Sequence, residues 1–173
     1  RDAGSVEEMY RRLTETLADV TTNYELIWVN DNSPDDAEKL LEALASRDEK
    51  VTVVSHSRNF GSQMALTSGM KQSLGEAVVL MDGDLQDPPE VIPDLVQNWL
   101  KGFDVVYGIR TKRKENSLMQ GARRLFYRIY QKLSYLEIPL DAGDFSLISR
   151  RVVNAMLAMP ERDRFLRGLR SWV

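Results

Sequence analysis

Short apolar runs alternate with amphipathic stretches along most of the chain. Four apolar runs have the length and composition of buried strands: 24–29, 51–55, 77–81 and 103–107. Between and after them, apolar residues recur at helical spacing in five stretches: 6–17, one ending near 45, 62–74, 89–101 and 150–159. Strands and helices that alternate through short links are typical of βαβ units. We therefore predict one α/β domain over residues 1–173, with a mostly parallel sheet flanked by helices.

The pattern changes after residue 110. Residues 111–117 are polar and basic, as in a loop, and 118–136 then place apolar residues on one face of a predicted amphipathic helix. Its basic residues form a stripe beside that face. Such a helix either lies at a membrane surface or packs on the core with a solvated edge, and periodicity alone favours the core. Residues 138–148 are expected to form a loop that enters a short strand.

The composition is that of an ordinary globular domain. Of 173 residues, 43% are hydrophobic and 28% charged, and no apolar run approaches the ~20 residues that span a bilayer. The chain contains no cysteine, which excludes disulfides and thiol chemistry. Because the chain starts with Arg1 in a loop-like stretch, we expect upstream residues that include a first strand.

The net charge of −3 conceals a segregation of charge. Eight basic residues and a single acidic one, Glu115, lie between Arg110 and Lys132, so the rest of the chain is acidic. A chain of this kind can hold a cation at one place and an anionic partner at another. Nucleic-acid binding is not expected, because the basic residues fall largely on one predicted helix rather than along a groove with base-stacking aromatic residues.

An acidic turn follows the third apolar run. Asp82 and Asp84 stand one residue apart at the end of that run, where open α/β sheets bind ligands. Five acidic residues and no basic residue lie between Asp82 and Asp94. Carboxylates this close repel one another unless a cation lies between them, and oxygen ligands favour Mg²⁺ or Mn²⁺. A solvated acidic turn before the next helix explains the same pattern equally well.

Two later stretches also carry candidate functional residues. Asp144 lies between Gly143 and Phe145, where an acidic side chain could be catalytic or could serve only in a turn. Arg164 and Arg167 belong to an arginine-rich segment. Arginine suits bidentate binding of phosphate, although a solvated surface helix has the same composition.

Six stretches, in order along nearly the whole chain, resemble the inverting family 2 glycosyltransferases with the GT-A fold. They are 29–35 (VNDNSPD), 57–61 (SRNFG), 81–90 (MDGDLQDPPE), 105–110 (VVYGIR), 142–145 (AGDF) and 164–168 (RFLRG). The likeness is strongest to the polyprenyl-phosphate glycosyltransferases and to dolichol-phosphate mannose synthase. It implies metal-dependent transfer of a sugar from a UDP- or GDP-sugar to a polyprenyl phosphate such as undecaprenyl phosphate, at the cytoplasmic face of the bacterial inner membrane.

The resemblance also implies roles for individual residues. Asp31 would contact the base or ribose of the donor, while Asp82 and Asp84, assisted by Gln86, would hold Mg²⁺ or Mn²⁺ on the donor diphosphate. Asp144 would lie near the acceptor and is, with Asp84, a candidate catalytic residue. Five arginines would receive the acceptor phosphate or close over it: Arg110, Arg123, Arg124, Arg164 and Arg167. The resemblance favours the membrane surface for the helix at 118–136, whose apolar residues could also serve a homo-oligomer interface.

The chemistry of the acceptor separates two versions of this function. A sugar hydroxyl needs a general base to take its proton, whereas a phosphate monoester, with a second pKa of ~6, is already ionised near neutral pH. The basic segment after Arg110 therefore favours the lipid phosphate, and extension of a glycan hydroxyl stays as the alternative. A non-catalytic nucleotide- or membrane-binding member of the fold is another. A phosphohydrolase is disfavoured, because Leu85 and Gln86 follow the acidic pair in place of Gly-Thr.

The sequence departs from the family at both ends and in one motif. The family's first strand, which supplies donor contacts, would precede Arg1, and transmembrane helices could follow Val173. Asn30 replaces the first acidic residue that many relatives carry before Asp31. The nature of the sugar, and the choice between UDP and GDP, have no readable signal.

Overall fold

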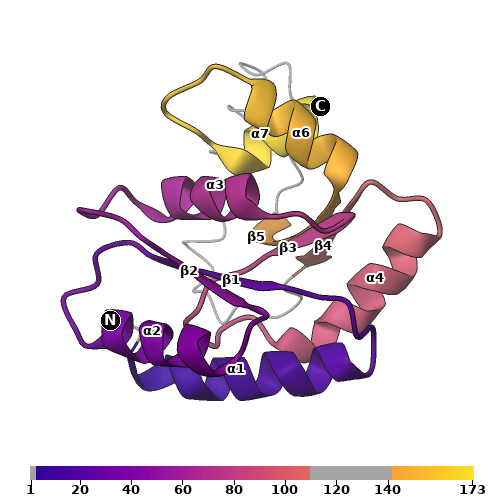
Figure 1. Ribbon diagram of the computed structural model, residues 1–173. Coiled ribbons are helices and arrows are strands. Elements are labelled where there is room, and N and C mark those ends of the chain that lie inside the picture. Colours follow the sequence, from indigo (N-terminus) through magenta and orange to yellow (C-terminus); the bar gives the residue numbers. More distant parts are fainter. Residues whose placement is uncertain (1–2, 110–141) are drawn as a thin grey trace, which may run out of the picture.

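The computed structural model describes residues 3–109 and 142–173. Its elements, in chain order, are α1 (Ala3–Ala18), β1 (Leu26–Asn30), α2 (Ala37–Arg47), β2 (Val51–Ser55), α3 (Ser62–Gln72), β3 (Ala77–Leu80), the 3₁₀ turn η1 (Pro89–Val91), α4 (Ile92–Leu100), β4 (Val105–Ile109), β5 (Ala142–Ser149), α6 (Arg150–Ala158) and α7 (Leu166–Trp172). Figure 1 shows α1 and α2 below β1 and β2, with α3 above them and α6 and α7 above α3. The predicted alternation of strands and helices is confirmed.

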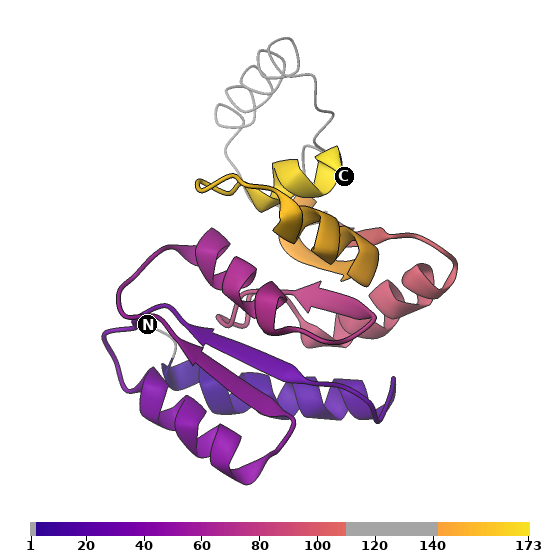
Figure 2. The same cartoon turned by 45° about the horizontal axis from the view of Figure 1, so that its top comes forward.

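The strands form two hydrogen-bonded groups. β1 and β2 pair in parallel, and Figure 2 shows them side by side beneath α3. In the second group β5 lies between β3 and β4 and is antiparallel to both, so β3 and β4 run parallel to each other. In the described part of the chain no hydrogen-bonded pairing joins the two groups. The first strand expected upstream concerns residues before Arg1 and stays a prediction.

β5 is longer and more central than the sequence indicates. We expected a loop that enters a short strand, but the strand spans all of Ala142–Ser149. Its last five residues, 145–149, are buried. They alternate between two cores: Leu147 packs with residues of α1, α2 and α4, and Ile148 with residues of α3, α6 and α7. Each such side chain contributes roughly 1.5–3 kcal/mol by leaving water, so β5 ties both layers of helices together.

An ion pair joins α1 to η1 just after the acidic turn. The Arg12 guanidinium donates from Nε at 2.7 Å and from Nη2 at 2.5 Å to the two carboxylate oxygens of Glu90. These hydrogen bonds lower the pKa of Glu90 to about 2. Because the Glu90 side chain is 54% exposed, solvent screens the pair, and its contribution stays in the range of about 0.2–1 kcal/mol typical of surface ion pairs.

Glu90→Gln should therefore lower the free energy of unfolding at pH 7 by less than about 1 kcal/mol. The lowered folded-state pKa means that this contribution is complete above the unfolded pKa and is lost as the pH falls from 4.5 towards about 2. Urea unfolding between pH 7 and pH 3 should show the two proteins converging on acidification. Glu42→Gln, at an exposed position of α2, is the matched control. A wild-type advantage that stayed constant with pH would contradict this assignment.

Candidate active site

The loop after β1 presents the carboxylate of Asp31 to three hydrogen-bond donors. The backbone N–H groups of Phe60 and Gly61 donate to Asp31 at 2.8 and 2.7 Å, and His56 Nδ1 lies 2.8 Å from Asp31 Oδ1. Gly61 adopts a φ of +89°, a conformation that glycine tolerates best. Burial raises the pKa of Asp31, but the hydrogen bonds outweigh this effect and hold it below its ordinary value. The carboxylate is thus charged and firmly oriented.

The rest of this loop is held by its own side chains. Asn30 Oδ1 accepts the N–H of Ser33 at 3.0 Å, and Ser33 Oγ donates to Asp35 Oδ1 at 2.8 Å. Asn32 has a φ of +56°, which asparagine adopts more readily than most residues. The density of turn-forming residues that marks this stretch of sequence therefore produces an ordered loop next to Asp31.

Asp82 and Asp84 lie in an exposed turn directly after β3. The N–H of Gln86 donates to Asp84 Oδ1 at 3.0 Å, and Leu85 between them has a φ of +63°. A left-handed conformation costs a non-glycine residue roughly 1–3 kcal/mol and persists only where its surroundings impose it. Here the Gly83 carbonyl accepts a 2.7 Å hydrogen bond from Ser5 Oγ of α1, and this bond fixes the turn to α1. The predicted acidic turn is thus a constrained one.

The antiparallel register of β3 and β5 relates this turn to Asp144. Leu80, the last residue of β3, pairs with Ser146. The carboxyl end of β3, which the acidic turn follows, therefore lies at the same end of this sheet as the first half of β5, which carries Asp144.

Asp144 joins helices α3 and α7. Arg167 Nε of α7 lies 3.1 Å from Asp144 Oδ1, and Gln63 Nε2 of α3 donates to Asp144 Oδ2 at 3.4 Å. The same Gln63 accepts the N–H of Leu166 through Oε1 at 2.9 Å. Gln63 lies two residues after Gly61, which contacts Asp31. The first turn of α3 therefore lies between Asp31 and Asp144, and both face the same region.

Two more arginines surround this region, in different ways. Arg164 donates to the carbonyls of Met156 and Met159 at 2.6 and 3.3 Å, so it caps the end of α6, and its predicted role in phosphate binding stays a prediction. Arg170 is buried and donates to Ser146 Oγ at 2.6 Å and to the Gly143 carbonyl at 3.1 Å.

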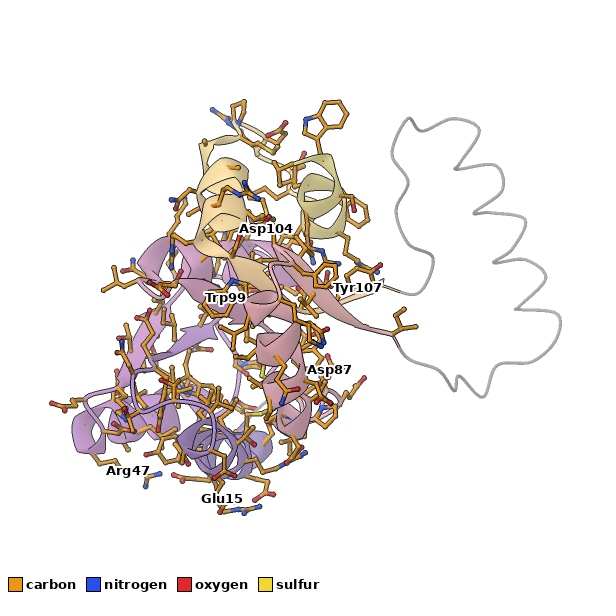
Figure 3. All side chains as sticks on the ribbon, turned by 90° about the vertical axis from the view of Figure 1, so that its right-hand side faces the viewer. Glu15, Arg47, Asp87, Trp99, Asp104 and Tyr107 are labelled. Carbon is orange, nitrogen blue, oxygen red and sulfur yellow. The ribbon has the colours of Figure 1, made fainter. Side chains whose placement is uncertain are left out.

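The Arg170 guanidinium also lies 5.4 Å from the centroid of the Tyr107 ring. Figure 3 shows Tyr107 on the same side of the molecule as Asp87. Burial lowers the pKa of Arg170, and the charge of Asp144 offsets part of that effect. Sequence reasoning missed Arg170, Gln63 and His56. For Arg170 a signal existed, since it follows Arg167 by three residues and so shares its helical face.

Asp82 and Asp84 are the carboxylates among the described residues that we consider as ligands of a metal ion. Residues 3–109 and 142–173 contain no group of three or more His, Cys, Asp or Glu side chains placed to share an ion. Mg²⁺ is commonly bound through one or two carboxylates, with substrate phosphates as further ligands. Asp82 and Asp84, exposed and one residue apart, fit that kind of site; for Gln86 the described contact is that of its backbone N–H.

Several predicted features lie outside the described residues. These are Arg110, Arg123, Arg124 and the amphipathic helix at 118–136. Of the helices in 3–109 and 142–173, none combines the length and the apolar character that crossing a bilayer requires.

Three comparisons place the chain among known proteins. The family model described as glycosyl transferase family 2 matches residues 5–157. An uncharacterized glycosyltransferase of Bacillus subtilis, YkcC, is 42% identical over 97% of the chain and 52% of its own length. A prophage bactoprenol glucosyl transferase homolog of Escherichia coli is 41% identical over 86% of the chain and 49% of its own length. The chain thus spans about half the length of these relatives.

Solved structures show the same fold at lower identity. Glucosyl-3-phosphoglycerate synthase of Mycobacterium tuberculosis, in complex with phosphoglyceric acid, has a TM-score of 0.58 at 23% identity, over 90% of this chain and 55% of its own. The mannosyltransferase PcManGT of Pyrobaculum calidifontis, in complex with GDP-Man and Mn²⁺, has a TM-score of 0.55 at 19% identity, over 92% of this chain and 46% of its own. Because the family model matches most of this chain and the Bacillus subtilis and Escherichia coli relatives exceed 40% identity, the chain belongs to glycosyl transferase family 2.

Proposed function

We propose that this chain is the catalytic domain of an enzyme that transfers a sugar, with inversion, from a UDP- or GDP-sugar to a polyprenyl phosphate. The observation that carries the proposal is that Gly61 and Gln63, at the start of α3, contact Asp31 and Asp144. Asp144 is paired with Arg167, and it lies on β5 at the end of the sheet where the Asp82–Asp84 turn follows β3. The relatives named bactoprenol glucosyl transferases support the choice of acceptor, since bactoprenol is a polyprenol.

The donor would bind across the ends of β1 and β3. The oriented Asp31 carboxylate would accept a hydrogen bond from the base or ribose of the nucleotide. Asp82 and Asp84, with Gln86, would hold Mg²⁺ or Mn²⁺ on the diphosphate, and the structural neighbour in complex with GDP-Man and Mn²⁺ supports a divalent ion. When bound, such an ion offsets the charge that develops on the leaving nucleoside diphosphate.

The acceptor would approach from the side of Asp144 and α7. A phosphate nucleophile and a diphosphate donor are both anions, so cations must reduce their repulsion. Arg167, which lies beside Asp144, is the first candidate, and Arg164, Arg110, Arg123 and Arg124 complete the proposed set. We place the reaction at the cytoplasmic face of the bacterial inner membrane, with the helix predicted at 118–136 on the membrane surface. We also propose that apolar residues of this helix form a homo-oligomer interface.

A hydroxyl acceptor is the second candidate, because Asp144 is an acidic side chain on the side from which the acceptor would approach. Its Oδ1 is buried beside Arg167, but the side chain as a whole is 20% exposed. A carboxylate in such a place can take the proton of an attacking hydroxyl. The two acceptors make opposite predictions about products, so one assay separates them.

The test is transfer of radiolabelled sugar from a panel of UDP- and GDP-sugars to undecaprenyl phosphate, using the full-length protein with Mg²⁺ or Mn²⁺. Label that moves into the lipid extract, and is abolished by EDTA, is the expected result. Metal-dependent nucleotide binding without lipid labelling would favour the hydroxyl acceptor. A full-length protein that binds no nucleotide sugar would overturn the enzymatic proposal.

A further inference from the structure

His56, the single histidine of the chain, lies between Asp31 and Ser68 and has no role in the proposal above. Its Nδ1 is 2.8 Å from Asp31 Oδ1, and its Nε2 is 2.9 Å from Ser68 Oγ on α3. The ring is 12% exposed and meets the Phe60 ring edge to face, with the centroids 5.3 Å apart. Both nitrogens of the imidazole therefore face protein partners, and the ring also packs against Phe60.

The partners determine which nitrogen carries the proton. An ionised carboxylate only accepts hydrogen bonds, so the His56 nitrogen that faces Asp31 must be an N–H. In the neutral ring Nε2 then accepts the hydroxyl proton of Ser68, and in the charged ring Nε2 donates to the same oxygen. In either state His56 donates to Asp31. Ser68 fixes the tilt of the ring from the opposite side.

The same three residues could be mistaken for a nucleophilic triad. Ser68 lies inside α3 (Ser62–Gln72), more than one turn from its start, where backbone N–H groups donate to carbonyls of the same helix. Donors of the kind that stabilise an oxyanion at a nucleophilic serine are therefore committed elsewhere. The contacts favour a role in orienting Asp31, which accepts hydrogen bonds from one side chain and two backbone groups.

We propose that His56 is a positioning residue for donor binding: it locks the Asp31 carboxylate in the orientation that the nucleotide requires. The inference rests on the proposed contact between Asp31 and the donor. Without His56, Oδ1 keeps the N–H of Phe60 and Oδ2 keeps that of Gly61, so the carboxylate stays in place but is held less firmly. The effect should fall on donor affinity rather than on the chemical step.

The experiment compares His56→Leu with His56→Asn in the full-length protein. Leucine fills the site without a donor, whereas asparagine keeps an N–H that can reach Asp31. We expect His56→Leu to raise the donor KM, and the Kd for UDP or GDP from calorimetry, about tenfold with kcat changed less than about twofold. His56→Asn should restore most of the affinity. Tyr10→Phe, which deletes the 2.9 Å hydrogen bond from Tyr10 to Asp48, is the matched control and should leave KM unchanged.

The outcomes separate this inference from the proposed function. Wild-type protein that binds no nucleotide overturns both. Wild-type binding together with an unchanged KM in His56→Leu, or a loss confined to kcat, overturns the inference alone. Should the leucine variant melt too early to assay, Ser68→Ala is the second test, because it leaves His56 in place and removes its support. It should raise KM about threefold, and no change there would equally overturn the inference.

Discussion

Asp84→Asn should lower the rate of sugar transfer by about a thousandfold. The substitution keeps the size of the side chain and its oxygen acceptor for the Gln86 N–H, but it removes the negative charge that a divalent ion requires. An ion on the donor diphosphate is worth several kcal/mol of charge stabilisation in the transition state, and about 4 kcal/mol corresponds to a factor of a thousand. The measurement is kcat/KM for transfer across a range of Mg²⁺ and Mn²⁺ concentrations.

Asp94→Asn is the matched control for this effect. Asp94 belongs to the same acidic stretch but lies exposed in the first turn of α4. Its substitution should leave transfer within about twofold of wild type, since surface changes away from a site have small effects. An Asp84→Asn protein that folds normally and keeps wild-type activity would contradict the assignment of the metal to this turn.

Asp144→Asn should reduce transfer to a polyprenyl phosphate by about a hundredfold. Asp144 aligns Arg167 through their 3.1 Å contact and is held in turn by Gln63. A charge-assisted contact of this kind is worth roughly 1.5–3 kcal/mol, which corresponds to a factor of ten to a hundred or somewhat more. If Asp144 acts by orienting Arg167, then Arg167→Gln should have a similar effect, and the double variant should be little worse than either single one.

A general base would behave differently. Loss of a base costs roughly a hundred- to ten-thousandfold in kcat and changes the pH dependence of the reaction. The pH profile of kcat, measured for wild type and for Asp144→Asn with the lipid phosphate as acceptor, distinguishes the two roles. Asp163→Asn, at an exposed position shortly before α7, controls for the change of charge alone. Additive effects of Asp144→Asn and Arg167→Gln would refute the orienting role.

Much of the fold could be predicted from local pattern. The run 51–55 coincides with β2, because its β-branched valines and threonine favour a strand, and the predicted helix starting at residue 62 begins there. The acidic turn after β3 and the ordered loop around Asp31 are likewise visible as motifs. The resemblance to family 2 glycosyltransferases rests on these same stretches, and the family model confirms it.

The local sequence pattern did not predict the full extent of β5. Gly143 and Asp144 suggest a loop, yet their segment is the beginning of a strand between β3 and β4. Partners from segments far apart in the chain complete its backbone hydrogen bonds, and this pairing outweighs weak local propensity. His56, Gln63 and Arg170 were missed for the same reason, since each derives its role from contacts 12 to 103 residues away.

By itself, then, the sequence determined most of the segments that become strands and helices, which of their ends carry acidic residues, and which family the chain resembles. These properties depend on neighbours along the chain and on side-chain chemistry. Only the tertiary structure decided that the Asp82–Asp84 turn and Asp144 lie at the same end of one sheet, and that the start of α3 connects Asp144 to Asp31. Such groupings arise from strand register and helix packing, which depend on interactions between segments that are distant in sequence.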